Sequence, residues 1–171
     1  TAEAARALIA AGGDLNVVND QGLTALIWAA RNGHAEVARA LIAAGAGLNV
    51  VDQDGFTALM LAAYEGHAEV ARALIAAGAD LNVVDQDGWT ALTWAALRGH
   101  AEVVRALIAA GADPNVVTYR GHTALMWAIN RGHAEVVRLL MPAPAVPAPG
   151  QPGQQGQPAP AAPAAAADAV A

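Results

Sequence analysis

Apolar and polar positions along residues 1–141 follow a pattern that returns every 33 residues. Two motifs mark this period, and no insertion or deletion disturbs their register. Gly-His-Ala-Glu-Val begins at Gly33, Gly66, Gly99 and Gly132, and Gly-x-Thr-Ala-Leu begins at Gly22, Gly55, Gly88 and Gly121. A fixed period of this length predicts an array of stacked structural units.

Each unit predicts two short helices separated by a glycine. A threonine precedes the first apolar segment, where its hydroxyl can accept a hydrogen bond from an amide of the helix N-terminus. These threonines are Thr24, Thr57, Thr90 and Thr123. In the first full unit, a helix is expected over residues 25–32, ended by Gly33 in the left-handed conformation. Apolar residues at helical spacing predict a second helix over residues 35–44, which Gly45 ends.

The segment between one unit's second helix and the next unit's first helix has a different composition. Residues 48–56 contain the β-branched pair Val50 and Val51, followed by Asp-Gln-Asp-Gly, which is typical of a tight turn. The unit is therefore predicted to run helix, turn, helix, then a protruding loop or hairpin. Such a unit cannot bury its apolar face alone, so neighbouring units are expected to stack into an all-α solenoid.

The period and three motifs together resemble the ankyrin repeat family in its bacterial form. The motifs are Asp-x-x-Gly-x-Thr-x-Leu, Gly-His-x-Glu-Val and Gly-Ala-Asp-x-Asn. The resemblance implies helix-turn-helix repeats with short protruding β-hairpins or loops. Within residues 1–141, it implies a half-repeat (1–18), three full repeats (19–51, 52–84 and 85–117) and a partial last repeat (118–141).

The sequence departs from the family pattern at the start of each first helix. The family usually has Thr-Pro-Leu-His there, and in this chain the proline is replaced by Ala25, Ala58, Ala91 and Ala124. Proline at the first helical position is already in the helical conformation. We therefore expect a lower stability than that of the family consensus.

Residues 142–171 form a different kind of segment. They contain eight of the nine prolines and consist mostly of Ala, Pro, Gln and Gly, a composition that cannot build a packed core. We expect a disordered tail or linker. PxxP spacings such as the one from Pro144 to Pro147 leave open a second interpretation, a ligand for an aromatic groove.

Composition and charge narrow the classes of partner. A formal net charge of −6 argues against a nucleic-acid partner, which would need a basic stripe. No run of 18 apolar residues is present, so membrane insertion is not expected. The chain has no Cys and suits oxidising and reducing compartments alike, so its localisation stays open, with the cytoplasm favoured. Ser and Lys are also absent, which is typical of a GC-rich bacterial coding bias.

Candidate catalytic chemistry is scarce. Ser and Cys nucleophiles are missing, and the threonines are assigned as helix caps. One histidine recurs in each repeat: His34, His67, His100 and His133. Stacked helices lie about 8–10 Å apart, whereas two nitrogens on one zinc ion lie about 3.5 Å apart. We therefore interpret these histidines as structural residues that help to fix the tight turn before the second helix. We interpret the recurring glutamates of the second helices as structural too. We expect no enzyme activity, no cofactor and no metal site.

The positions that differ between repeats are the candidate binding residues. The second helices are nearly constant, whereas the loop tips and the ends of the first helices vary. The resemblance implies that these regions line a concave side that binds a protein partner. Aromatic and Arg side chains, which dominate interface energetics, occur among them. The large aromatic residues Phe56, Tyr64, Trp89 and Tyr119 are predicted to stand at positions that the repeat does not need for its core. The candidates are Leu23, Arg31, Phe56, Tyr64, Glu65, Trp89, Leu97, Arg98, Tyr119, Arg120, His122, Asn130 and Arg131.

Several alternatives to this interpretation remain open. The variable positions can also reflect neutral variation at exposed sites. Trp28, Trp94 and Trp127 share one repeat position and are either packed between helices or displayed as anchors on the concave side. The partner is expected to be one protein, bound by a monomer as a 1:1 complex. Neither end of the array has a polar capping helix, which suggests missing upstream repeats and a second function, self-association or structural stacking through uncapped ends.

Overall fold

The computed structural model of this chain describes residues 2–141, and the predicted tail lies outside them. The helices in this part of the chain are α1 (Ala2–Ala10), α2 (Ala25–Asn32), α3 (Ala35–Ala43), α4 (Ala58–Glu65), α5 (Ala68–Ala76), α6 (Ala91–Arg98), α7 (Ala101–Ala109), α8 (Ala124–Arg131) and α9 (Ala134–Leu140). Helix α1 falls within the predicted half-repeat, and each later pair of helices falls within one predicted repeat.

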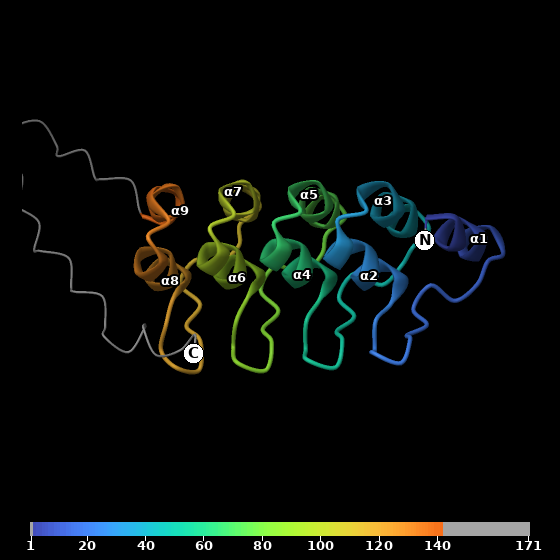
Figure 1. Cartoon of the computed structure of the whole chain (residues 1–171), viewed down its shortest axis with the longest axis horizontal. Helices are drawn as coiled ribbons and strands as arrows, with labels where there is room; N and C mark the ends of the chain where they lie inside the picture. The colour runs from blue at the N-terminus through green and yellow to red at the C-terminus, as the bar shows by residue number, and fades with distance from the viewer. Residues whose placement is uncertain (1, 142–171) are drawn as a thin grey trace, which may run out of the picture.

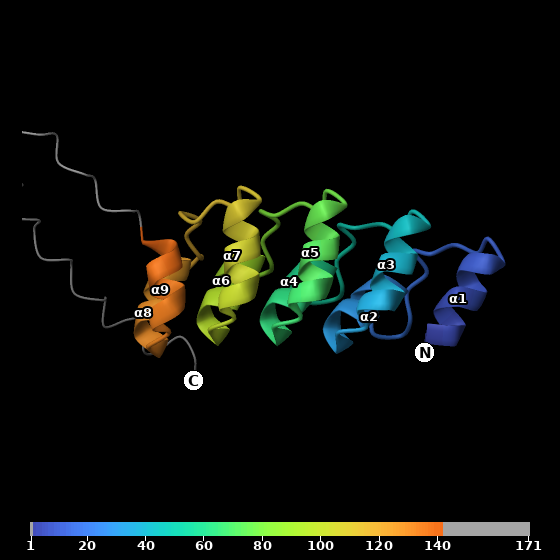
Figure 2. The ribbon, with the colours of Figure 1, turned by 90° about the horizontal axis from the view of Figure 1, so that it is seen from above.

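The helices form two parallel rows. The first helices α2, α4, α6 and α8 make one row and contact each other in sequence, while α3, α5, α7 and α9 make the other, which α1 extends by packing on α3 (Figure 1). Seen from above, the helix pairs follow one another along a single axis (Figure 2). The predicted all-α solenoid is confirmed.

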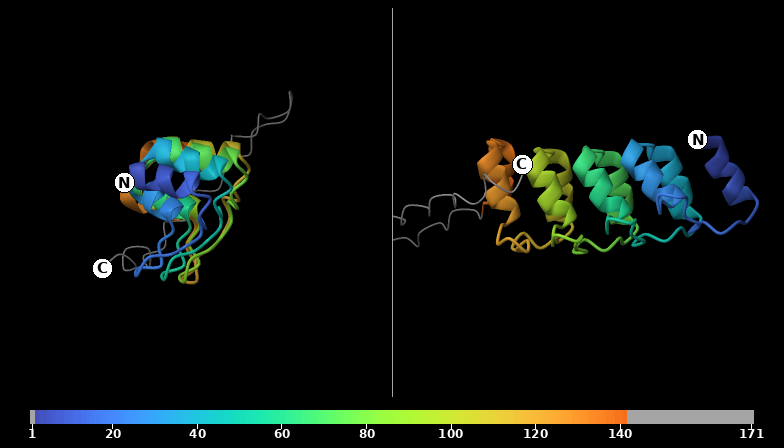
Figure 3. Two further views of the ribbon diagram at one scale, coloured as in Figure 1. Left: turned by 90° about the vertical axis from the view of Figure 1, so that its right-hand side faces the viewer. Right: turned by 60° about the horizontal axis from the view of Figure 1, so that its bottom comes forward.

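The connecting loops all project from the row of first helices toward the same side (Figures 1 and 3). The loop of the second full repeat is closed by backbone hydrogen bonds, from the Asp52 amide to the Phe56 carbonyl (3.0 Å) and from the Gly55 amide to the Asp52 carbonyl (3.1 Å). No β-strand is assigned within residues 2–141. Of the two predicted forms, loop and β-hairpin, the structure has the loop.

The predicted helix boundaries follow from local chemistry. The Thr57 hydroxyl accepts a hydrogen bond from the Met60 amide and so caps α4, and the other three threonines cap their helices in the same way. Gly66 ends α4 with φ +81°, a left-handed conformation that costs an L-residue energy. These caps confirm the predicted roles of the threonines and of the glycines that end the first helices.

The core lies between the two rows. Small residues such as Ala62 and Ala63 have no exposed surface and let neighbouring helices approach closely, while Leu59 and Leu74 fill the space between layers. The core runs without interruption from α1 to α9. Each repeat therefore buries its apolar surface both between its own two helices and against its neighbours.

The recurring histidines hold adjacent repeats together. Their Nε2 atoms donate to a carbonyl at the end of the preceding repeat's first helix: His67 to Arg31 (3.2 Å), His100 to Tyr64 (3.0 Å) and His133 to Leu97 (3.0 Å). We predicted that the histidine fixes the turn within its own repeat. Its hydrogen bond instead crosses to the neighbouring repeat, a contact that a period along the chain does not reveal.

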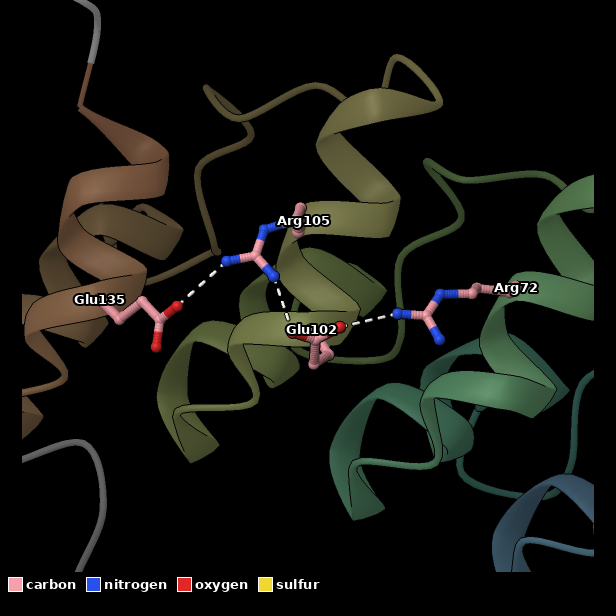
Figure 4. A network of polar contacts seen from close by, with 4 residues as sticks. All are labelled: Arg72, Glu102, Arg105 and Glu135. Atoms are coloured by element: carbon pink, nitrogen blue, oxygen red, sulfur yellow. Dashed lines mark hydrogen bonds and ion pairs between the residues drawn. The ribbon is translucent and has the colours of Figure 1, made fainter.

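Two further series of polar contacts cross the same junctions. Asparagine oxygens accept from amides of the next repeat, as between the Asn49 side chain and the Asp80 amide (2.9 Å). On the second helices, Arg72 pairs with Glu102 (2.7 Å), and Arg105 pairs with both Glu102 (2.7 Å) and Glu135 (3.0 Å), which links α5, α7 and α9 (Figure 4). Because these side chains are half exposed or more, the ion pairs contribute little to stability.

The histidine contact requires glycine at the end of the first helix for a second reason. A Cβ atom added to Gly66 would lie 2.6 Å from Cε1 of His100. Gly78, which ends the second helix, has a similar left-handed φ of +92°, but nothing lies within 4 Å of its added Cβ. Gly66 and Gly78 share the left-handed backbone conformation, but only Gly66 has a side chain packed close to it. Comparing substitutions at the two positions therefore separates the cost of the backbone conformation from the cost of the histidine contact.

We expect Gly78→Ala to lower the free energy of unfolding by about 1–2 kcal/mol, the cost of a left-handed L-residue. Gly66→Ala should cost about 1–3 kcal/mol more, because it also displaces the His100 ring. Urea unfolding followed by circular dichroism measures both values. Equal losses for the two variants would contradict the close histidine contact.

Candidate protein-binding face

The loop tips and the ends of the first helices enclose three adjoining hollows, and we call this surface the concave face. The acidic hollow (≈ 300 Å³) is lined by Phe56, Tyr64 and Trp94 together with Arg31, Asp52, Asp54, Leu61 and Glu65. The arginine hollow (≈ 520 Å³) is lined by Tyr64, Trp94, Leu97, Arg98, Arg131 and His133. The tryptophan hollow (≈ 300 Å³) is lined by Asp87, Trp89, Trp94, Leu97, Thr118, Tyr119, Arg120, His122 and Trp127. Trp94 borders all three.

The predicted binding residues divide into three groups by exposure. Arg31, Glu65, Arg98, Tyr119, Arg120, Asn130 and Arg131 are exposed. Phe56 and Tyr64 are half-buried. Leu23, Trp89, Leu97 and His122 are buried.

The buried group corrects part of the sequence interpretation. We predicted that the aromatic residues of this set stand at positions that the repeat does not need for its core. Trp89 is only 9% exposed and forms a buried cluster with Leu97 and Trp127, so for Trp89 this prediction was wrong. Its ring packs against those of Trp94 and Trp127, with centroids 4.3 and 5.0 Å away. A large aromatic residue at a variable position can fill a local layer instead of facing solvent.

The three tryptophans that share one repeat position have different environments. Trp127 has no exposed surface and belongs to the core. Trp94 is half-buried and forms walls of the hollows. Trp28, also half-buried, stacks on His34 with centroids 4.9 Å apart. The tryptophan at this repeat position is therefore a core residue in the last repeat and a partly exposed residue in the first and third full repeats.

Asp85 fixes the orientation of the Trp94 ring. This aspartate is 5% exposed, and its Oδ2 accepts a hydrogen bond from the Trp94 indole N–H (2.9 Å). Its Oδ1 accepts from the amides of Asp87 (2.9 Å) and Trp89 (3.0 Å) and so shapes the loop. The Asp-Gln-Asp-Gly pattern that begins at Asp85 predicted only a tight turn there. The signal that could have identified its second role is that Asp at this position coincides with Trp nine residues later only in the third full repeat.

In the last repeat, a threonine replaces this aspartate. Thr118 accepts a hydrogen bond from the His122 amide, but the indole nitrogen of the fully buried Trp127 has no hydrogen-bond partner within the described residues. Nδ1 of His122 is also buried without a partner there. This repeat therefore keeps the loop-shaping hydrogen bond to residue 118 and lacks the one that orients the indole.

Charge changes sign along the concave face. Asp54 and Glu65 lie at the acidic hollow, whereas Arg98 and Arg131 line the arginine hollow. The Arg98 guanidinium lies over the Tyr64 ring, with Cζ 4.6 Å from the centroid. The face thus presents negative charge beside α4 and positive charge beside α6 and α8.

His100 lies at the junction between these two regions. Burial lowers the pKa of its imidazole, and the nearby Arg98 and His133 lower it further, while the Tyr64 carbonyl and Glu65 oppose the shift. The ring is therefore neutral at neutral pH. Because a carbonyl only accepts, the Nε2 proton belongs to the hydrogen bond with Tyr64.

Within residues 2–141, no three His, Asp or Glu side chains gather closely enough to hold a metal ion. None of the helices in this range is long and apolar enough to cross a membrane. What the arrangement offers is a row of aromatic, arginine and carboxylate side chains around shallow hollows, which suits non-covalent binding.

These features define a helical repeat scaffold with one variable face. A family model described as ankyrin repeats, in three copies, matches residues 1–85 and 74–147. The chain belongs to the ankyrin repeat family, and the resemblance in the sequence is confirmed. Ankyrin repeats are generally protein–protein interaction modules, and proteins built from them are typically non-enzymatic. No curated protein matches the sequence significantly.

The contrast between Asp85 and Asp52 yields a test of the Trp94 support. Both shape their loops through Oδ1, but Leu61 stands in the second full repeat where Trp94 stands in the third. Asp85→Asn should lower the free energy of unfolding by about 1–3 kcal/mol, because the amide group cannot accept the indole N–H and shape the loop together. Asp52→Asn should change it little, since Asn19 occupies this position in the first full repeat.

Urea unfolding of both variants, followed by tryptophan fluorescence, measures the difference. Equal stabilities of the two variants would show that the indole hydrogen bond does not support Trp94.

Proposed function

We propose that this chain binds one protein partner through its concave face and acts as an adaptor, scaffold or inhibitor. The observation that carries the proposal is a division of labour between positions. The constant histidines, asparagines and Arg–Glu pairs are occupied by contacts between repeats. The exposed variable side chains, such as Tyr119, Arg98 and Arg131, gather around the hollows.

The shape of this surface favours a protein over a small molecule. The three hollows are small, adjoin one another and extend from α2 to α8, each shared between neighbouring repeats. Because repeats follow each other at about the 8–10 Å spacing of packed helices, a ligand that reaches all of them must be extended. A strand, a helix or a loop of a folded protein meets this requirement.

The side chains on this face also suit a protein interface. Tyr119 is 74% exposed at a loop tip, and a tyrosine this exposed provides a large, rigid contact area. Arginines on the same face can form paired hydrogen bonds with carboxylates of a partner. No hydrogen bond among the described residues of this face joins a hydroxyl to an imidazole nitrogen, which supports a role in holding a partner without changing it covalently.

Variants of exposed residues test which face binds. We expect Tyr119→Ala and Arg131→Ala each to weaken partner binding about thirtyfold if they are interface hot spots worth about 2 kcal/mol. Arg72→Ala, which removes an exposed ion pair between second helices, should leave affinity unchanged. A pull-down with mass spectrometry identifies the partner, and calorimetry with purified proteins then measures the affinities. Binding that depends on Arg72 and not on Tyr119 would place the partner on the second helices.

A second candidate function is stacking on another repeat unit. It is favoured by an opening beside α2, at the end of the array that begins with α1. Within residues 2–141, α4 and α6 have a first helix on both sides, whereas α2 has one only on the side of α4. On the other side of α2 lies an apolar hollow of ≈ 480 Å³, lined by residues that include Leu8, Leu23 and Trp28. This hollow occupies the position at which a further first helix would continue the row.

Static light scattering over a wide range of concentrations tests this candidate. Stacking between copies predicts a mass that rises above that of the monomer, and Leu8→Gln should reverse the increase by placing a polar group in the hollow. Val84→Gln, on an exposed loop in the middle of the array, serves as the control. A monomer mass at every concentration would eliminate self-association.

A further inference from the structure

The acidic hollow combines aromatic walls at steep angles with a negatively charged rim. Phe56 and Tyr64 both meet Trp94 edge to face, with ring centroids 5.8 and 5.2 Å apart and interplanar angles of 69° and 81°. Leu61 adds an apolar side chain between them. Three aromatic rings that line one small hollow at different angles are suited to a compact cation, which is attracted to the negative face of any ring that it reaches.

The charges around these rings have the matching sign. Asp52, Asp54 and Glu65 line the hollow, against the single guanidinium of Arg31. None of these four residues forms a salt bridge with a described residue. Three carboxylates and one cation give the hollow an excess of negative charge, which a positively charged ligand would neutralise.

We propose that the acidic hollow binds the ammonium group of a lysine side chain that the protein partner inserts. The inference rests on the proposed function and names the chemistry of one contact within it. The aliphatic stem of the lysine would lie along Leu61 and Phe56, with the ammonium between the rings and the carboxylates. A volume of ≈ 300 Å³, at the lower end of ligand pockets (about 300–1,000 Å³), matches one side chain.

The shape of the hollow favours lysine over arginine. A planar guanidinium stacks on a single aromatic face, as Arg98 already does on Tyr64. Arg98 already covers one face of Tyr64. The Trp89 ring packs on Trp94 with centroids 4.3 Å apart at 32°, so few open faces remain for a second stacked guanidinium. A compact ammonium group needs no parallel ring. Arg98 lines the neighbouring arginine hollow and not this one, so it restrains Tyr64 without filling the proposed site.

The walls are held in place before any ligand binds. The hydrogen bond from Trp94 to Asp85 fixes the indole ring, and the Arg98 contact holds Tyr64. Half-burial further limits the rotation of Phe56 and Tyr64. Preorganised walls lower the entropy cost of binding. This matters for a single inserted side chain, because it makes few contacts that could offset that cost.

The described repeats contain their own comparison. One repeat further on, the tryptophan hollow has Leu97 in place of Tyr64. Glu65 has no counterpart in its lining, because Arg98, at the equivalent repeat position, lines the arginine hollow. The acid of the tryptophan hollow, Asp87, lies beside Arg120 in the lining. The tryptophan hollow therefore lacks the excess of carboxylates, and its tyrosine, Tyr119, lies at a loop tip instead of at the end of a first helix. We expect it not to bind lysine.

A titration of the isotope-labelled full chain with Nα-acetyl-lysine amide tests the proposal without the partner. The tryptophan indole N–H signals are followed by NMR and assigned through Phe variants of Trp28, Trp89 and Trp127. We expect a saturable shift of the Trp94 signal and none at Trp28. Nα-acetyl-norleucine amide, which keeps the stem and lacks the charge, should produce no saturable shift.

Matched variants use residues that other repeats already carry. Tyr64→Leu combined with Glu65→Asn introduces the residues found at positions 97 and 32, so the scaffold tolerates them. This double variant should bind the lysine probe about tenfold more weakly, through lost cation–π and charge attraction. Asp87→Gln, which places the residue of position 21 one repeat away from the hollow, should bind it as tightly as the unmodified chain.

Four results would overturn the proposal: no saturable shift, equal binding of norleucine amide, unchanged binding by the double variant, or tighter binding of arginine amide. Each of them leaves the proposed function standing if Tyr119→Ala still weakens partner capture. Conversely, lysine could bind at Trp94 while variants of the concave face leave partner capture unchanged. That result would contradict the proposed function and leave the acidic hollow as a lysine-binding site.

Discussion

The structure depends on one junction, which recurs between each pair of neighbouring repeats. An imidazole lies against the glycine that ends the preceding first helix and donates to a carbonyl of that helix. The carbonyls at a helix C-terminus lack partners within the helix, so this bond satisfies a group that would otherwise need water. A Cβ atom at position 66 would meet the imidazole at 2.6 Å, so the position of the His100 ring requires glycine there. The Asn contacts and the Arg–Glu pairs cross the same boundary.

This junction also determines where the molecule can vary. The residues that stack the repeats lie on the second helices and in the turns, and they change little from repeat to repeat. The loop tips and first-helix ends make fewer such contacts, among them those of Gln53 and Gln86 with carbonyls of the preceding loop and that of Arg98 with Tyr64. Their side chains differ from repeat to repeat. A face that is free to vary, on a scaffold held by its other side chains, can acquire a new specificity one residue at a time.

The aromatic residues illustrate how far a pattern predicts a site. Their positions in the repeat indicated where the hollows form, because the hollows are lined largely by residues that differ between copies. Their individual roles did not follow. Trp89 and Trp127 are buried because bulky neighbours fill their layers, while Trp94 borders open hollows, held by Asp85. Burial depends on what the adjacent repeat supplies, and two copies with the same residue can therefore differ.

The sequence by itself determined the architecture: the 33-residue period, the threonine caps, the helix-ending glycines and the all-α solenoid. These features are local, since a hydroxyl three residues from an amide or a glycine at a helix end acts within one repeat. Only the tertiary structure decided the histidine bonds, the indole hydrogen bond of Trp94 and the three hollows. Each of these needs atoms from two repeats or from both ends of a loop, and their distances depend on how closely the alanine-lined helices approach.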